Sequence, residues 1–267
     1  MPVTDTLPHI KHQLRTFGTL WVDGANSEGA SLGRRRSLAL LVIAAVDANR
    51  GANRDTLVSL LWPDSSIDRA ASSFRQTLFA LRKDLGTEAI LLDGGTVRLN
   101  PDRFDVDVWR FLASAAESRF EIAADVYSGP FMEGFGISGL PGFARWAEDQ
   151  RETLQRRAEA VFLELARRAA AEERRADAVA HWRRVVTLDR LSGRYAMGLL
   201  RALVENGERT SALSFARDYQ ALVRSELDTE LDTDVADYVQ HLRANRIAVS
   251  APHVPRDAAP VPTRRWP

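Results

Sequence analysis

The stretch ASSFRQTLFALRKDLG, residues 71–86, carries side chains that can contact bases and phosphates. If it is a helix, with about 100° per residue, its apolar residues form one narrow stripe: Phe74, Leu78, Leu81 and Leu85. Roughly opposite lie Arg69, Ser72, Gln76, Phe79 and Lys83, with Ser73, Arg75 and Arg82 on the flanks. Arginine can bond guanine edges or phosphates, glutamine can bond adenine, and an apolar group can contact a thymine methyl. The face suits a DNA major groove, although a plain amphipathic helix with a solvated basic face explains this segment about as well.

Two further sets of cations fit the same chemistry. Arg34, Arg35 and Arg36 stand at a predicted helix start, where the helix dipole disfavours positive charge. Phosphate contact explains their placement, and so does the covering of apolar surface by solvated arginine stems. Arg98 follows a predicted hairpin turn and is placed to reach a minor groove or a phosphate backbone, or to lie on plain surface.

The elements that would position these residues are readable over the first hundred positions. The pattern predicts short strands within 12–22, helices over 34–49, 54–62 and 70–85, and a β-hairpin around Asp93, Gly94 and Gly95. Strands, three helices and a terminal hairpin are the layout of a winged helix, whose third helix enters a DNA groove. We therefore expect a winged-helix DNA-binding domain over residues 1–104.

From residue 105 the chain is predicted to be all-helical. Helical patterns cover 107–127, 142–172, 176–188, 194–206, 210–226 and 231–245. Residues 174–185 lie over 208–219 at an offset of 34 residues, with Ala178 matching Ala212, which is typical of tetratricopeptide-like helix hairpins. We expect this second domain to span residues 105–247. Residues 248–267 are rich in proline and alanine, and we interpret them as a disordered tail or linker.

The composition limits the class of protein. The chain has 267 residues with 36 basic and 36 acidic side chains, so any contact with nucleic acid requires a local patch. It has no cysteine, which excludes disulfides, thiolate catalysis and cysteine-bound zinc. The longest apolar run, residues 38–46, is far shorter than the roughly 20 residues of a membrane span, and the start lacks a signal-peptide pattern. A cytoplasmic protein without a membrane partner is expected.

No enzyme motif was found in the sequence. It has no HExxH motif, no phosphate-binding glycine loop and no nucleophile elbow, so we expect no catalysis, no metal and no cofactor. Asp105 and Asp107 are interpreted as a helix cap and a linker contact rather than an acid/base pair. Four tryptophans are expected in the core: Trp62, Trp109, Trp146 and Trp182.

The order of the motifs resembles a known family. The strings LRTFGTLWVDG, LGRRRSLALL, RDTLVSLLWPD, LRKDLG and GGTVRL resemble the DNA-binding half of the Streptomyces antibiotic regulatory proteins. The strings FDVDVWRF, ADVYSGPFMEGF, FARWAEDQRETL and ALSFARDYQALVRSELDTEL resemble the bacterial transcriptional activator domain that follows it. The resemblance runs from Leu14 to Leu242.

This resemblance implies a mainly α fold: a response-regulator-type winged helix followed by an all-α tetratricopeptide-like domain. It also implies binding to direct repeats of double-stranded DNA at promoters, dimerisation on DNA, and contact with the sigma or alpha subunit of RNA polymerase. By position, the recognition helix is Ala70–Leu85, with Arg75, Gln76 and Arg82 on matched positions, and the wing is Asp93–Arg98. Phe79 and Ala80 depart from the family pattern, which affects the expected base preference. With about a dozen residues before the first strand, no phosphoacceptor domain is expected.

The sequence therefore predicts a sequence-specific transcriptional activator. An alternative stays open: a tetratricopeptide-like protein- or effector-binding module whose DNA-binding domain is weak or vestigial. The zero net charge favours this alternative.

Overall fold

The computed structural model describes residues 11–23, 35–46 and 50–249, with side chains up to 244. The chain divides into two compact units, Met1–Arg167 and Arg168–Pro267. The fold is mainly helical, with two small sheets in the first unit. Residues 250–267 of the expected tail lie outside the described residues, as does Arg34.

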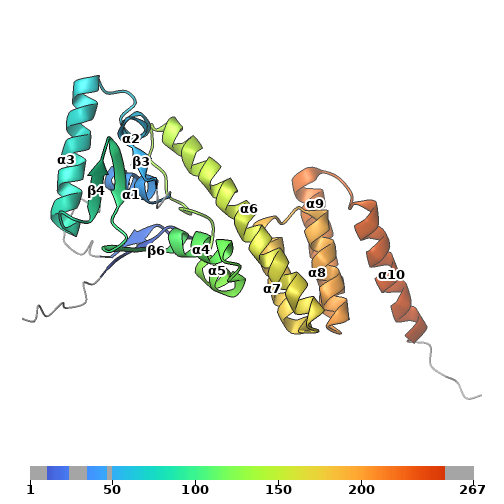
Figure 1. Ribbon diagram of the computed structural model, residues 1–267. Helices are drawn as coiled ribbons and strands as arrows, with labels where there is room; N and C mark the ends of the chain where they lie inside the picture. The colour runs from blue at the N-terminus through green and yellow to red at the C-terminus, as the bar shows by residue number, and fades with distance from the viewer. Residues whose placement is uncertain (1–10, 24–34, 47–49, 250–267) are drawn as a thin grey trace, which may run out of the picture. The chain divides into compact units, whose positions relative to one another are not determined.

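The first unit contains six strands and six helices among its described residues. The last of these helices, α6, continues into the second unit and is the long yellow-green helix in Figure 1. The strands are β1 His12–Arg15, β2 Trp21–Val22, β3 Ala52–Asn53, β4 Ile90–Asp93, β5 Thr96–Leu99 and β6 Phe104–Val106. The helices are α1 Arg35–Val46, α2 Arg54–Leu61, α3 Ile67–Leu85, α4 Asp107–Ala116, α5 Phe120–Val126 and α6 Pro141–Ala171. The sheets have the strand orders β2-β1-β6 and β3-β5-β4.

Three predicted helices and the predicted hairpin are confirmed. The central helix α1 is buried along residues 39–45, which explains its nearly continuous apolar sequence. The start of α2 is capped by Asn53, whose side-chain oxygen accepts a hydrogen bond from the Asp55 amide at 2.7 Å. The hairpin β4–β5 turns through Gly94 and Gly95, both with positive φ, which glycine adopts without steric cost. An additional strand, β3, pairs with β5 and was not predicted.

The N-terminal strands are joined to residues far along the chain. Strand β1 runs parallel to β6, with His12 opposite Phe104 and Leu14 opposite Val106. The segment after β1 also pairs with the segment before α6: the Gly18 amide donates to the Pro130 carbonyl at 2.9 Å and the Met132 amide to the Thr16 carbonyl at 2.7 Å. Residues up to 167 thus belong to one compact unit. The limit between residues 104 and 105, expected between the winged-helix and the tetratricopeptide-like domain, stays a prediction.

Asp107 is the polar centre of this connection. Its carboxylate accepts hydrogen bonds from the amides of Thr16, at 2.7 and 2.9 Å, and Phe17, at 2.9 Å. It also accepts from the Thr16 hydroxyl at 2.7 Å and from the Val108 amide at 2.7 Å, at the start of α4. The predicted linker contact is confirmed at Asp107, whereas the predicted cap is not observed, because the N-cap of α4 is Val106 and no side chain caps this helix start.

Among its described residues, up to 249, the second unit contains the end of α6 and four further helices: α7 Arg175–Leu188, α8 Gly193–Glu205, α9 Arg209–Leu227 and α10 Thr233–Val249. The 34-residue offset reappears in it, since α7 and α9 start 34 residues apart, at Arg175 and Arg209. The turns before them have the same hydrogen bond. The backbone amide of Arg174 donates to the Ala169 carbonyl, and the backbone amide of Glu208 donates to the Leu203 carbonyl, both at 2.8 Å. Each turn contains a positive φ, at Glu173 and Gly207.

Small residues let these helices pack closely. Ala178 and Ala212, which the offset superposes, are both buried. The core of the unit joins α7, α8, α9 and α10 through a cluster that includes Leu199, Leu200 and Val239. Neighbouring helices therefore supply most of the packing.

Two expectations need correction. The pattern over 107–127 is two helices, because the chain turns at residues 117–119 with Ser118 at positive φ. Of the four tryptophans expected in the core, only Trp62 is fully buried. The indole of Trp109 is half-buried and donates to the Ala45 carbonyl at 2.5 Å, and Trp146 and Trp182 are half-buried as well.

Candidate nucleic-acid interface

The helix α3 has one buried side and one side open to solvent. Ala70, Phe74, Leu78, Leu81 and Leu85 are buried in the first unit, which confirms the apolar stripe. On the other side, five residues are exposed and two serines are half-buried: Arg69, Arg75, Gln76, Phe79 and Lys83, with Ser72 and Ser73. We call these seven residues the α3 outer face. No described part of the chain covers the exposed five.

Two apolar side chains of α3 are unusually exposed. Phe79 is 72% exposed at the centre of the α3 outer face, and Ile67 is 89% exposed at the first residue of the helix. The exposed Phe79 ring gives the otherwise polar α3 outer face one apolar group that a partner can contact, and aromatic rings are enriched in contact surfaces. Sequence analysis missed Ile67, whose position before the periodic stripe gave no signal.

Arg82 is oriented differently from the other cations. Its Nη2 donates to the Ile90 carbonyl at 2.7 Å and its Nε to the same oxygen at 3.2 Å, and the side chain is half-buried. Arg82 therefore joins α3 to the first residue of β4. This contact holds the hairpin beside the helix and occupies the guanidinium that was expected to reach DNA.

A hollow of about 650 Å³ lies beside the α3 outer face. It is bordered by Ser73, Gln76 and Thr77 of α3, by Arg35 and Arg36 at the start of α1, and by Ile137 and Ser138 before α6. The helix dipole of α1 points its positive end at the same place. The two arginines at the start of α1 thus border the same hollow as Ser73 and Gln76 of α3.

The two described arginines of the α1 start differ in their contacts. Arg35 donates to the Gly136 carbonyl at 2.5 Å and lies over the Phe135 ring at 5.7 Å. Arg36 is exposed and forms no ion pair with the described residues. Arg36 is therefore the better candidate for a phosphate contact.

Arg98 lies over the backbone before β3. A Cβ atom added to Gly51 would lie 2.1 Å from its Cγ, so the arginine stem covers the glycine. Its guanidinium is 3.8 Å from the Asp93 carboxylate on the paired strand. This pair joins the two strands of the hairpin, which was the expected wing.

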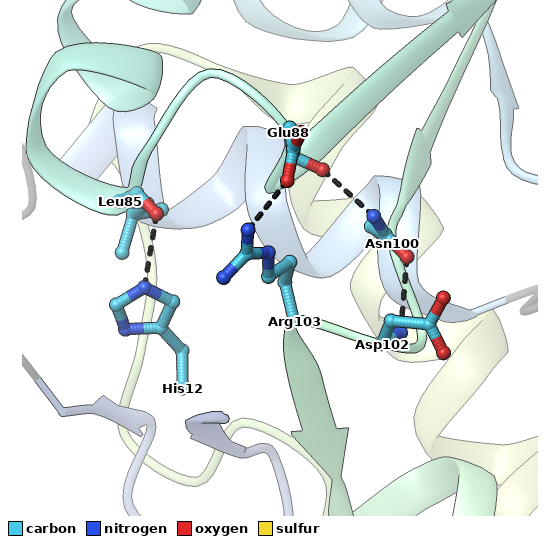
Figure 2. A network of polar contacts seen from close by, with 6 residues as sticks. All are labelled: His12, Leu85, Glu88, Asn100, Asp102 and Arg103. Atoms are coloured by element: carbon cyan, nitrogen blue, oxygen red, sulfur yellow. Dashed lines mark hydrogen bonds and ion pairs between the residues drawn. The ribbon is translucent and has the colours of Figure 1, made fainter. Parts of the chain in front are cut away.

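The C-terminal end of α3 is fixed by polar contacts with the N-terminal sheet (Figure 2). The His12 ring nitrogen lies 3.0 Å from the Leu85 carbonyl. In the neighbouring loop, Arg103 pairs with the Glu88 carboxylate, and the Asn100 amide donates to the Glu88 carbonyl at 3.0 Å. These contacts join the end of α3 and the following loop to β1 and to the segment before β6. His12 was not singled out from the sequence, because nothing local links it to residue 85.

Neither unit has, among its described residues, a group of histidine, aspartate or glutamate side chains that could bind a metal ion. None of the helices described is long and apolar enough to cross a membrane.

A family model for the bacterial transcriptional activator domain matches residues 108–243. The chain belongs to the bacterial transcriptional activator domain family. The resemblance inferred from the motif order is thereby confirmed. The matched range begins in α4 and ends in α10, so it covers every helix after α3.

A solved structure shares the fold of this activator domain protein. It is Mycobacterium tuberculosis EmbR in complex with a low affinity phosphopeptide, with a TM-score of 0.57 and 20% sequence identity. The match covers 89% of this chain and 65% of the EmbR chain. None of the curated proteins matches the chain.

Proposed function

We propose that the protein is a sequence-specific DNA-binding transcriptional activator. In this proposal residues 1–104 are a winged helix of response-regulator type, with α3 in the major groove and the β4–β5 hairpin as the wing. One observation carries it: the α3 outer face presents cations, an amide and an aromatic ring to solvent, while the other side of α3 is buried. Membership of a family named for transcriptional activation supports it.

The side chains have different roles in the proposed complex. Arg75 and Gln76 read base edges, and Phe79 contacts a thymine methyl. The phosphates are contacted by Arg69, Lys83, Ser72, Ser73, Arg34 and Arg36, which position the helix without reading sequence. Arg35 is instead held by the Gly136 carbonyl and the Phe135 ring. Arg82 and Arg98 act mainly by fixing the hairpin, because Arg82 is bonded to the Ile90 carbonyl and Arg98 covers Gly51.

The remaining parts of the proposal concern assembly. Two copies bind same-orientation half-sites of a direct repeat and form a dimer on DNA. Residues 105–247, the tetratricopeptide-like part, support this dimer and contact the sigma or alpha subunit of RNA polymerase, in the cytoplasm. The repeated turns before α7 and α9 support the tetratricopeptide-like assignment.

The deciding experiment is selection of bound sites from random double-stranded DNA by the full chain, followed by a stoichiometry measurement on the best site. We expect a consensus with two same-orientation half-sites about 10 bp apart, bound by two copies. Binding without any enriched sequence would contradict base reading by α3. One copy per site would contradict the dimer.

A second candidate is a tetratricopeptide-like protein- or effector-binding module with weak or vestigial DNA binding. A large hollow in the second unit, of about 960 Å³, favours it alongside the zero net charge. Failure of the selection together with tight capture of a partner would favour this candidate over the first.

A further inference from the structure

The second unit contains a hollow of about 960 Å³ built on one side of α8. Its floor is a stripe of α8 with helical spacing: Arg194, Met197, Gly198, Arg201, Ala202 and Glu205. Trp182 of α7 stands on one side, and Tyr238 of α10 stands on the other. We call this the α8 hollow.

The middle of the α8 hollow is apolar. A Cβ atom added to Gly198 would lie 2.3 Å from the Trp182 ring, so the indole lies flat on the backbone of α8. Trp182, Met197 and Tyr238 are all half-buried, each with part of its surface facing the open space. Three large, partly open apolar side chains around a small floor can hold one apolar side chain of a ligand.

The ends of the α8 hollow are acidic. Asp232 lies against Gly193 at the start of α8, since a Cβ added there would be 2.3 Å from its carboxylate, and Asp234 borders the same end. Glu205 is the last residue of α8 and borders the opposite end. None of these three carboxylates forms an ion pair within the described part of the chain.

The two arginines of the α8 hollow are already engaged. Arg194 lies over the Tyr195 ring at 4.9 Å and donates to its hydroxyl at 3.0 Å. Arg201 lies over the Tyr238 ring at 6.0 Å. Four carboxylates also line the hollow: Glu205, Asp232, Asp234 and Asp237. With the two arginines, the formal charge of the lining is −2, whereas the net charge of the chain is zero. The free charge that a ligand meets is negative.

The length of the α8 hollow sets the size of its ligand. Residues 194 and 205 are eleven helical steps apart, which is about 17 Å at about 1.5 Å per residue. An extended peptide advances about 3.3 Å per residue, so roughly five residues span this length. The two acidic ends then face the two ends of such a peptide, and the apolar middle faces its central residue.

We propose that the α8 hollow binds an extended segment of a partner protein with a basic–apolar–basic pattern over about five residues. The central apolar side chain contacts Trp182 and Tyr238. One basic side chain pairs with Asp232 and Asp234, and the other pairs with Glu205. This site is separate from the α3 outer face, so it stands or falls independently of DNA binding.

The test measures fluorescence anisotropy with two dye-labelled, acetylated and amidated peptides against the full chain. The first has arginine at both ends, leucine at the centre and serine between; the second has glutamate in place of each arginine. We expect the arginine peptide to bind at least 10-fold more tightly than the glutamate peptide. The double variant Glu205→Gln with Asp234→Asn should reduce this binding about 10-fold, because each end loses one carboxylate and only Asp232 remains at the two ends.

A matched control removes the same charge elsewhere in the unit. Asp218 and Glu226 are exposed on α9 and do not border the α8 hollow. The variant Asp218→Asn with Glu226→Gln should bind the arginine peptide as the unchanged protein does. Equal losses in both double variants would mean nonspecific attraction and would overturn the site, as would equal binding of the two peptides or no binding of either. All the substituted side chains are exposed, so folding is retained and is checked by thermal melting.

Discussion

The α3 outer face and part of the second unit differ in how their cations are paired. In the second unit three exposed arginines are paired with carboxylates near them in sequence or on the next helix: Arg174 with Glu172 and Asp177, Arg183 with Glu208, and Arg224 with Glu230. The pKa of Arg174 is raised by its hydrogen bonds to Asp177 and Glu172. On α3, by contrast, Arg69, Arg75 and Lys83 form no ion pair with any described residue.

This difference matters for binding more than for stability. Exposed ion pairs add little to folding, but they cancel the field that a charged partner would meet. Unpaired cations on a fixed helix keep their field directed at solvent, which suits a polyanion. A protein with zero net charge can therefore still present one basic surface.

The units also differ in what holds them together. The first depends on single polar contacts between residues far apart in sequence, such as Asp107 with Thr16, 91 positions away. The second depends on packing between successive helices, with Ala178 and Ala212 at the close approaches. Removal of one group should therefore damage the first unit far more than the second.

The largest expected effect is that of Asp107→Ala. The change removes a carboxylate that accepts from two amides and a hydroxyl after β1 and from the Val108 amide. Loss of these hydrogen bonds and exposure of unpaired buried donors should cost about 3 kcal/mol of unfolding free energy, measured by urea unfolding. The matched change Asp105→Ala removes only a pair with Arg110 at 3.9 Å and should cost less than about 0.5 kcal/mol. Equal effects would contradict the central role of Asp107.

The next effect concerns the free cations and amide of α3. Arg75→Ala and Gln76→Ala should each weaken binding to the selected DNA site by about 1–3 kcal/mol, while nonspecific binding stays nearly unchanged. Titration by anisotropy on selected and scrambled DNA measures both. Arg183→Ala, which removes a paired arginine of the second unit, is the control and should change neither. Equal losses on scrambled DNA would exclude base reading by these two residues.

Local patterns explain what was predictable in this chain. The apolar stripe of α3 and the 34-residue repeat of α7 and α9 were predicted from helical periodicity, which depends only on residues close together in the sequence. The hairpin follows from Gly94 and Gly95, since the turn needs positive φ at those positions. The exposed face of α3 could thus be named before the structure was known.

Long-range contacts explain what was not predictable. The parallel pairing of β1 with β6 joins His12 to Phe104, and no local signal connects them. The turn that divides α4 from α5 has Ser118 rather than glycine at its positive φ, so the helical pattern continued through it. The position of Arg82 in the helical pattern predicts an exposed cation, but its guanidinium donates a hydrogen bond to the Ile90 carbonyl. In each case a distant or backbone partner decides the outcome.

A smaller effect tests the packing of the second unit. Gly198→Ala places a Cβ 2.3 Å from the Trp182 ring, so the indole must move. Overpacking costs about 1–3 kcal/mol and alanine regains about 1 kcal/mol of helix propensity, which leaves a net loss of about 1 kcal/mol. Gly142→Ala in α6 is the control, because its nearest neighbour would be 3.7 Å away, and it should be neutral or stabilising. Urea unfolding compares the two; a stabilised Gly198 variant would mean that the indole is free to shift.

The smallest effect separates the two described arginines at the start of α1. Arg36 is exposed and forms no ion pair with the described residues, whereas Arg35 is held by the Gly136 carbonyl and the Phe135 ring. If Arg36 contacts one phosphate, Arg36→Ala should lower the slope of log affinity against log salt by about 0.9 on every DNA sequence alike. Arg35→Ala should leave that slope nearly unchanged and instead lower thermal stability, because it removes a contact within the unit. If Arg35→Ala lowers the slope and Arg36→Ala does not, Arg35 must leave the Gly136 carbonyl and the Phe135 ring to contact DNA. The absence of an internal partner would then not identify the DNA-contacting arginine at this helix start.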